Sequence, residues 1–246
     1  MVMKKVFVCG ANGFIGGSLI KSLEDSYDVV GIRRENYREL KNEEGDVFIN
    51  ANGSSKKYLA EQEPICDFDK AVKSVFSTIF DFKFEHYIYI STLDAYRDSV
   101  YGINRYLSEQ SLIRHAKRLG FHLNIVRLGF VIGCGMKKGV IYDIINRKEL
   151  YVTADSSFQI IPTYEIVGFI KYLVENKPEK QIFDFAATTS VTVDEISKIL
   201  EVDAMIGGKS TVKQEYHYDV SDAKEIYDIK TSQEYLFRLR SALQRR

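Results

Sequence analysis

The sequence of 246 residues is poor in the residue types that mark several protein classes. Its three cysteines, Cys9, Cys66 and Cys134, are too few and too scattered for a disulfide framework, so we expect a cytoplasmic protein. The four histidines show no metal-ligand spacing, and we expect no metal site. The 34 basic residues balance 34 acidic ones, which argues against a nucleic-acid partner. No apolar run approaches the ~20 residues of a membrane span, and the N-terminus lacks a signal-peptide core, so no membrane partner is expected.

The N-terminal stretch has the pattern of a strand, a tight glycine turn and a helix. Lys5 to Cys9 is a short β-branched run typical of a buried strand, and Leu19, Ile20 and Leu23 then recur at helical spacing. Glycines in such a turn let the backbone approach a pyrophosphate at the helix N-terminus, where the helix dipole favours an anion. The alternative is a turn that merely tolerates glycine. The pattern favours dinucleotide binding, with these candidate cofactor residues: Gly10, Asn12, Gly13, Phe14, Ile15 and Gly16.

The next strand, Tyr27 to Ile32, ends in two arginines, Arg33 and Arg34. In dinucleotide-binding folds an acidic residue here binds the 2′-hydroxyl of NAD, whereas arginine accommodates the 2′-phosphate of NADP. We therefore expect NADP, with NAD as the alternative, although both arginines could instead be ordinary surface residues. Residues 35–42 read as a short helix.

Residues 46–51 already form the next buried strand, too soon after the second for a full crossover, so the usual third strand should be missing or vestigial. The adenine side of the cofactor site should then be open. Asn52 follows that strand in a polar loop and is a further candidate cofactor residue.

Three residues could carry acid–base chemistry. Thr92 ends the strand that begins at His86, while Tyr101 and Arg105 lie four residues apart on the following helix and share one of its faces. A nearby cation stabilises a phenolate, which helps a tyrosine to exchange protons near neutral pH. A hydroxyl, a phenol and a cation in this arrangement suit hydride exchange with a nicotinamide, although an ordinary helix contact explains the Tyr–Arg spacing equally well.

The order of these segments resembles the extended short-chain dehydrogenase/reductase family, which includes nucleotide-sugar epimerases, dehydratases and reductases. The resemblance rests on five segments, which are Gly10–Gly16, Ile90–Tyr96, Tyr101–Glu109, Arg127–Gly133 and Phe158–Val167. It implies an α/β Rossmann fold with a doubly wound parallel sheet and a small C-terminal α/β lobe. It gives Thr92 and Tyr101 the catalytic Ser/Thr and Tyr roles, and it implies a homodimer as one arrangement.

The chain departs from the family pattern at three positions. Arg105 stands in place of the family lysine. It can still bond the nicotinamide ribose, and the resemblance makes Arg105 and Tyr101 candidate cofactor residues as well, but the ribose-binding geometry of a lysine is not assured. Phe130 replaces an asparagine that helps to hold the substrate diphosphate, and Leu93 replaces an acidic residue that dehydratases carry. Dehydration is therefore not expected, and Asp94 is either a substrate contact or an ordinary loop acid. The candidate substrate residues are Thr92, Asp94 and Phe130.

These observations predict an NAD(P)-dependent reductase or epimerase acting on a secondary alcohol or ketone, with a nucleotide sugar as the substrate class. We expect residues 1–135 to form the dinucleotide-binding domain, with core strands completed by 150–190, and residues 136–246 to form mostly a substrate-binding lobe. The alternative is a non-catalytic NADP-binding sensor or regulatory subunit, which the replacements at Arg105 and Phe130 motivate.

Overall fold

The structure is a computed structural model that describes residues 3–207 and 212–245. The chain divides into two compact units, one formed by Met1–Arg127 with Val167–Phe183 and the other by Leu128–Ile166 with Asp184–Arg246. Among the described residues, no helix combines the length and the apolar character needed to cross a membrane.

The first unit is built on a six-stranded sheet in the order β10-β5-β4-β3-β1-β2. Neighbouring strands β1 and β2, β1 and β3, and β3 and β4 pair in parallel. Strands β1, β3 and β4 are almost wholly buried, as expected for parallel strands covered on both faces. The expected α/β doubly wound fold is confirmed. The strands are β1 (Lys5–Cys9), β2 (Asp28–Ile32), β3 (Val47–Asn50), β4 (His86–Thr92), β5 (His122–Leu128) and β10 (Ile182–Phe185).

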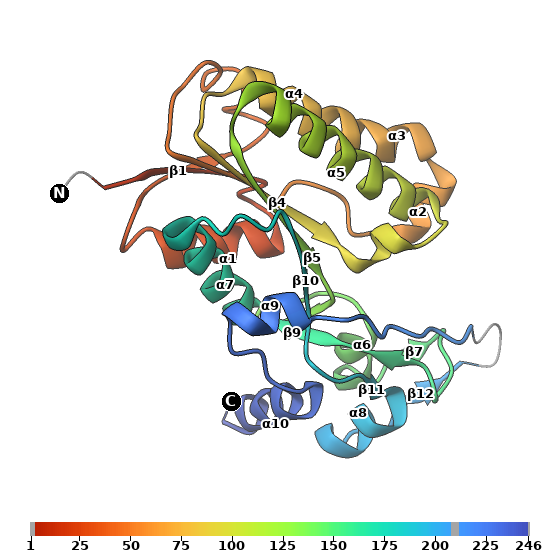
Figure 1. The fold of residues 1–246 in the computed structure, drawn as a ribbon. Helices are drawn as coiled ribbons and strands as arrows, with labels where there is room; N and C mark the ends of the chain where they lie inside the picture. Colours follow the sequence, from red (N-terminus) through yellow and green to blue (C-terminus); the bar gives the residue numbers. More distant parts are fainter. Residues whose placement is uncertain (1–2, 208–211, 246) are drawn as a thin grey trace. The chain divides into compact units, whose positions relative to one another are not determined.

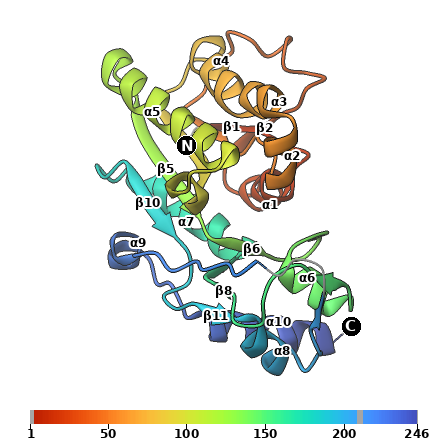
Figure 2. The ribbon, with the colours of Figure 1, turned by 90° about the vertical axis from the view of Figure 1, so that its right-hand side faces the viewer.

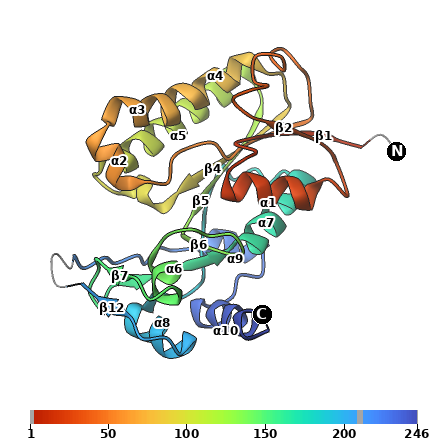
Figure 3. The same ribbon diagram turned by 180° about the vertical axis from the view of Figure 1, so that it is seen from behind.

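Helices cover both faces of this sheet (Figures 1 and 3). Helices α1 and α7 lie on one face, and α3, α4 and α5 lie on the other. Between α3 and α4 the chain makes a π-helical segment, η1, so residues 64–81 run as one interrupted helix. The rings of Phe7, Phe48, Phe82 and Tyr87 pack together in the core on the side of α4. The elements are α1 (Phe14–Leu23), α2 (Lys57–Gln62), α3 (Pro64–Phe68), η1 (Asp69–Lys73), α4 (Ser74–Asp81), η2 (Leu93–Tyr96), α5 (Val100–Leu119) and α7 (Thr163–Asn176).

The expected loss of the third strand is confirmed, because β2 is the outermost strand of the sheet and β3 is the next strand in the chain. The helix expected over residues 35–42 is wrong, since these residues form turns. The Asn36 side chain accepts from the backbone N–H of Arg33 at 2.7 Å and donates to the Gly31 carbonyl at 3.0 Å. These bonds stabilise a turn instead of a helix start. A shallow hollow of about 390 Å³ lies between residues 37–41 and the η1–α4 segment.

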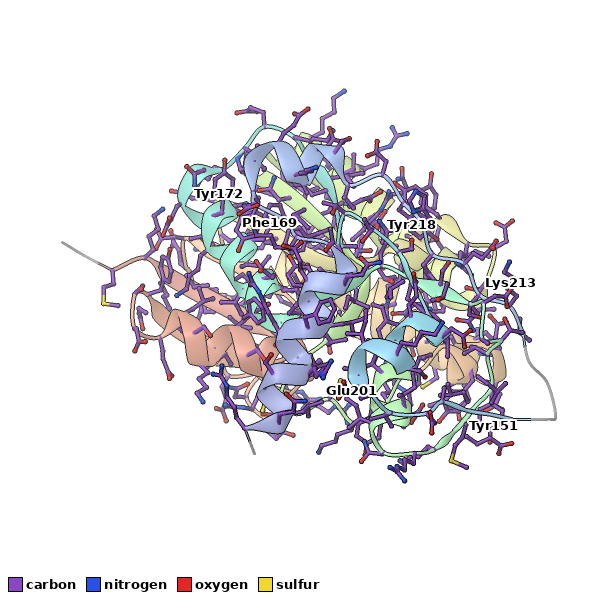
Figure 4. The ribbon with its side chains drawn as sticks, turned by 90° about the horizontal axis from the view of Figure 1, so that it is seen from below. Tyr151, Phe169, Tyr172, Glu201, Lys213 and Tyr218 are labelled. Atoms are coloured by element: carbon purple, nitrogen blue, oxygen red, sulfur yellow. The ribbon has the colours of Figure 1, made fainter. Side chains whose placement is uncertain are left out.

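The second unit contains short strand pairs and helices (Figure 2). Strand β6 pairs in parallel with β9, β8 pairs antiparallel with β11, and β12 pairs in parallel with β7. Helix α8 begins with the expected capping box between Thr192 and Glu195. Tyr151, Glu201, Lys213 and Tyr218 belong to this unit, whereas Phe169 and Tyr172 lie on α7 (Figure 4). The elements are β6 (Phe130–Ile132), α6 (Val140–Ile145), β7 (Glu149–Leu150), β8 (Ser157–Phe158), β9 (Ile160–Pro162), β11 (Val191–Thr192), α8 (Val193–Leu200), β12 (Met205–Ile206), α9 (Ser221–Ile226) and α10 (Ser232–Gln244).

Candidate functional site

The glycine turn between β1 and α1 is required by close approaches of the backbone. Gly10 has a φ of +87°, and a side chain there would place its Cβ 2.7 Å from the carbonyl oxygen of Ala51. A Cβ on Gly16 would overlap the carbonyl oxygen of Gly10. The turn therefore packs directly against the carboxyl end of β3, and the glycines at both ends of it cannot carry side chains.

The N-terminus of α1 lies open to an anion. Its N-cap residue, Gly13, makes no side-chain capping bond, and no acidic residue lies in the first turn. The first backbone N–H groups of a helix, here from Phe14, Ile15 and Gly16, have no partner within the helix and carry the positive end of its dipole. Helix N-termini of this kind are suited to bind an anion, and this one lies next to β1.

Arg33 is tied to this turn. Its Nε donates to Oδ1 of Asn12 at 2.9 Å, while Asn36 holds its backbone N–H. Arg34 is also exposed. An arginine anchored through Nε presents the terminal nitrogens of its planar fork to a phosphate without having to be ordered first. The structure therefore brings Arg33 together with the glycine turn.

Asn52 follows β3 at the same edge of the sheet. Its backbone N–H donates to Oδ1 of Asn50 at 3.0 Å, and its Nδ2 donates to Oγ of Ser74 at 2.7 Å. The side chain thus connects the loop after β3 to the start of α4. It helps to fix the loop against which Gly10 packs.

Thr92 ends β4 and caps the short helix η2. Its hydroxyl accepts from the backbone N–H of Asp94 and donates to the Asp94 carboxylate, both at 3.2 Å. Asp94 is buried and pairs with Nζ of Lys57 on α2 at 2.5 Å. The carboxylate of Asp94 therefore anchors the segment that follows Thr92.

Tyr101 and Arg105 lie on the buried face of α5. The helix is capped by Ser99, whose hydroxyl accepts from the N–H of Gly102 at 3.1 Å. The guanidinium carbon of Arg105 lies 4.8 Å from the ring centroid of Tyr101, in a cation–π contact. Its Nη2 donates to the carbonyl of Ser54 at 2.7 Å, so the cation lies against the loop after β3.

Arg105 stays charged although it is only 4 % exposed. Burial alone would lower its pKa, but electrostatic interactions with Tyr89 and Tyr101 raise the pKa above its ordinary value. Asp67 adds to this stabilisation, and its carboxylate accepts from Nδ2 of Asn104 at 2.9 Å. Arg105 is therefore a permanent cation in a site with little water.

A buried ion pair that the sequence analysis missed joins α5 to β5. The carboxylate of Glu109 is fully buried and accepts two hydrogen bonds from Arg127. Nε of Arg127 lies 3.0 Å from Oε1 of Glu109, and Nη2 lies 2.6 Å from Oε2. It also accepts from the hydroxyl of Ser91, next to Thr92, at 2.5 Å. The spacing of Tyr101, Arg105 and Glu109, each four residues apart, is a signal that could have placed Glu109 on the same face.

Asp67, Asn104 and Ser54 were also missed. Asp67 lies 37 residues before Asn104, and Ser54 lies 51 residues before Arg105, so no local sequence pattern predicts these contacts. Phe130 lies in the second unit, where its ring packs against that of Phe158 at 5.4 Å. Among residues 3–207 and 212–245, no group of three or more His, Cys, Asp or Glu side chains is arranged to hold a metal ion.

The structure is similar to solved enzymes at low sequence identity, while no family model and no curated protein matches the chain. It superposes on UDP-N-acetylglucosamine 4-epimerase of Methanobrevibacter ruminantium with a TM-score of 0.80 and 16 % identity, over 100 % of this chain and 99 % of that one. The chain therefore shares the fold of this epimerase, in agreement with the fold expected from the sequence.

Two further solved enzymes share this fold. RMD of Pseudomonas aeruginosa, solved with NADPH, has a TM-score of 0.82 and 15 % identity over 97 % of this chain and 98 % of its own. A tyrosine-to-phenylalanine variant of UDP-glucuronic acid 4-epimerase from Bacillus cereus was solved with a fluorinated UDP-sugar and NAD. It has a TM-score of 0.79 and 14 % identity over 98 % of this chain and 99 % of its own.

Proposed function

We propose that the protein is an NADP-dependent reductase or epimerase that acts on a secondary alcohol or ketone of a nucleotide sugar. One observation carries the proposal. The glycine turn, Arg33, Asn52 and Thr92 follow four parallel strands of one sheet, and Tyr101 and Arg105 open the helix after the last of them. In doubly wound folds, ligands bind at this carboxyl edge.

The residues at this edge suit a dinucleotide. The uncapped start of α1 supplies donors for a pyrophosphate, and Gly10 and Gly16 let the turn pack closely against the end of β3 and against itself, which places those donors at the edge of the sheet. Arg33, held by Asn12, suits the 2′-phosphate that distinguishes NADP from NAD, and we assign Asn52 to the loop facing the cofactor. When bound, a nicotinamide supplies or accepts a hydride. The solved neighbours contain NADPH in one case and NAD in another.

The chain's own residues would manage the substrate oxygen and its proton. In the reductive direction, the Thr92 hydroxyl would turn its proton from the Asp94 carboxylate to the substrate oxygen and orient it, and the Tyr101 phenol would donate its proton to the same oxygen. Arg105 lies against the ring of Tyr101 and is buried, so its charge acts at short range and in a low dielectric. It favours negative charge on the phenol oxygen after proton transfer.

The substrate class rests on the neighbours, of which the Methanobrevibacter enzyme holds UDP-N-acetylmuramic acid. We assign the second unit to substrate binding, with Phe130 as one contact, and Asp94 either contacts substrate or only anchors its loop. The missing third strand leaves the adenine side open, which suits a cofactor that exchanges between turnovers. Exchange is needed for net reduction and not for epimerisation, so we favour the reductase. We also retain the prediction of a cytoplasmic protein, based on the small number and the scatter of its cysteines.

Replacing Tyr101 with phenylalanine tests the proposal. Ligands are first identified by thermal-shift screening of NAD(H), NADP(H) and nucleotide sugars, because binding raises the melting temperature. With the ligands found, Tyr101→Phe should lower turnover by about 10²- to 10⁴-fold, the usual worth of a positioned acid–base group, and leave cofactor affinity unchanged. Tyr58→Phe, at an exposed position on α2, is the control and should change neither.

The second candidate is a non-catalytic NADP-binding sensor. The observation favouring it is the burial of Arg105 beneath the Ser54 carbonyl, which makes the arginine a tie between α5 and the loop after β3. A sensor would bind NADP(H) and show no turnover with any nucleotide sugar, and Tyr101→Phe would not change its binding. Absence of affinity for any dinucleotide would refute both candidates.

We propose that the protein forms a homodimer through an apolar stripe on the first unit. The stripe lies on the outer surface of the 64–81 helical segment and of α5, and its members are 40–75 % exposed. Such a patch on two neighbouring helices is typical of a surface that another protein covers. Light scattering should give twice the chain mass, and a monomer would refute the proposal. The members are Ile65, Phe68, Phe76, Phe80, Ile103, Tyr106 and Leu107.

A further inference from the structure

The guanidinium of Arg105 occupies the space where a side chain at position 53 would lie. A Cβ built on Gly53 would meet Nη2 of Arg105 at 2.9 Å and both its Cζ and its Nη1 at 3.1 Å. These distances are shorter than ordinary van der Waals contacts, which begin near ~3.5 Å. Any residue other than glycine at position 53 would therefore compete with the arginine for the same volume.

The arginine has little freedom to move away. Its Nη2 is bonded to the Ser54 carbonyl, its Cζ lies over the Tyr101 ring, and the side chain is almost completely buried. Within the described ranges 3–207 and 212–245, Nη1 is buried with no hydrogen-bond partner. Steric overlap with a side chain at position 53 would therefore break the hydrogen bond from Arg105 to the Ser54 carbonyl, or change the distance between the guanidinium and the Tyr101 ring.

We propose that Gly53 is a positioning residue for the candidate site, matched to the arginine at position 105. By lacking a side chain, Gly53 admits a planar guanidinium beneath the loop after β3 and so fixes the cation beside Tyr101. A lysine at position 105 would not need this space, because its ammonium is compact and has no planar fork. The proposal rests on the proposed function only in assigning Arg105 to the cofactor end of the site.

A double-mutant cycle tests the match. Gly53→Ala alone should raise the Kd for NADPH by about tenfold or more, in the range of couplings between contacting residues. Arg105→Lys alone should also weaken binding, because it removes the Ser54 bond and leaves a void. Adding Gly53→Ala to Arg105→Lys should cost less than about twofold, or restore affinity, because the methyl group then occupies the vacated space. An equal cost of Gly53→Ala in both backgrounds would overturn the proposal.

Backbone strain is controlled separately, because Gly53 has a φ of +151°. Gly120→Ala is the matched control, since Gly120 has a φ of +78° and a Cβ there would meet nothing within 4 Å. It should lower the melting temperature through strain and leave NADPH affinity unchanged. If the wild-type protein binds no dinucleotide, the proposed function fails. In that case the free energy of unfolding is measured for the same four proteins of the cycle. Additive changes in this free energy would refute the proposed match between Gly53 and Arg105, and coupled changes would support it.

Discussion

Arg33 gives the sharpest prediction about cofactor choice. It is exposed, but Asn12 holds its Nε at 2.9 Å and Asn36 holds its backbone at 2.7 Å, so its fork is ordered before any ligand arrives. A hydrogen bond to a charged group contributes about 1.5–3 kcal/mol, which corresponds to about 10- to 150-fold in Kd. Because Arg33 is exposed and screened by solvent, we expect Arg33→Gln to weaken NADPH binding near the lower end, about 10- to 30-fold.

The effect should be specific to the 2′-phosphate. NADH lacks this group, so Arg33→Gln should change its Kd by less than about threefold, and calorimetry with both nucleotides measures the difference. Arg34→Gln is the matched control, because it removes an adjacent exposed arginine and should reduce NADPH affinity much less than Arg33→Gln does. Equal losses for NADPH and NADH, or a larger loss for Arg34→Gln, would refute the assignment of Arg33 to the phosphate.

Two further predictions concern stability. Glu109→Ala strands the buried guanidinium of Arg127 and should lower the free energy of unfolding by about 3–5 kcal/mol in urea titrations. Asp69→Ala breaks only the exposed pair with Lys73 and should have no measurable effect, so similar losses for both variants would contradict this reasoning. Burial lowers the pKa of His86 to about 3, below the unfolded value of about 6.5. The folded protein should therefore lose stability as the pH falls from about 6.5 towards 3, and His86→Gln should make thermal unfolding less dependent on pH in this range, whereas an unchanged dependence would refute the assignment.

The fold could be predicted from the sequence where local patterns are strong. The run Lys5 to Cys9 is a strand with those bounds, and α5 begins one residue before the Tyr101 expected from the motif. The missing third strand also followed from simple counting, because the chain between β2 and β3 is too short for a crossover. These features depend on periodicity and chain length, which a single sequence displays directly.

The prediction failed where side chains satisfy the backbone in place of a helix. Residues 35–42 have helix-forming composition, but the Asn36 side chain bonds the backbone of Gly31 and Arg33 just before the turn, and Tyr37 donates to Asp81 on α4 at 2.8 Å. The sequence supplied candidate residues for the site but not the contacts that those residues make. Thr92, Tyr101 and Arg105 could be named from spacing, whereas the place of the guanidinium beside Gly53 depends on a partner 52 residues away and could not.

The proposed cofactor site combines exposed phosphate-binding groups with an open adenine side. The elements proposed to bind phosphate are the uncapped α1 and the anchored Arg33, and β2 is the outermost strand of the sheet on that side. Affinity should then depend more on charge than on enclosure of the adenine. Charge interactions at exposed sites weaken as salt screens them, whereas stacking and burial do not. NADPH binding that falls steeply with ionic strength, alongside NADH binding that falls less, would therefore indicate recognition by phosphate, and binding insensitive to salt would place the affinity in the adenine instead.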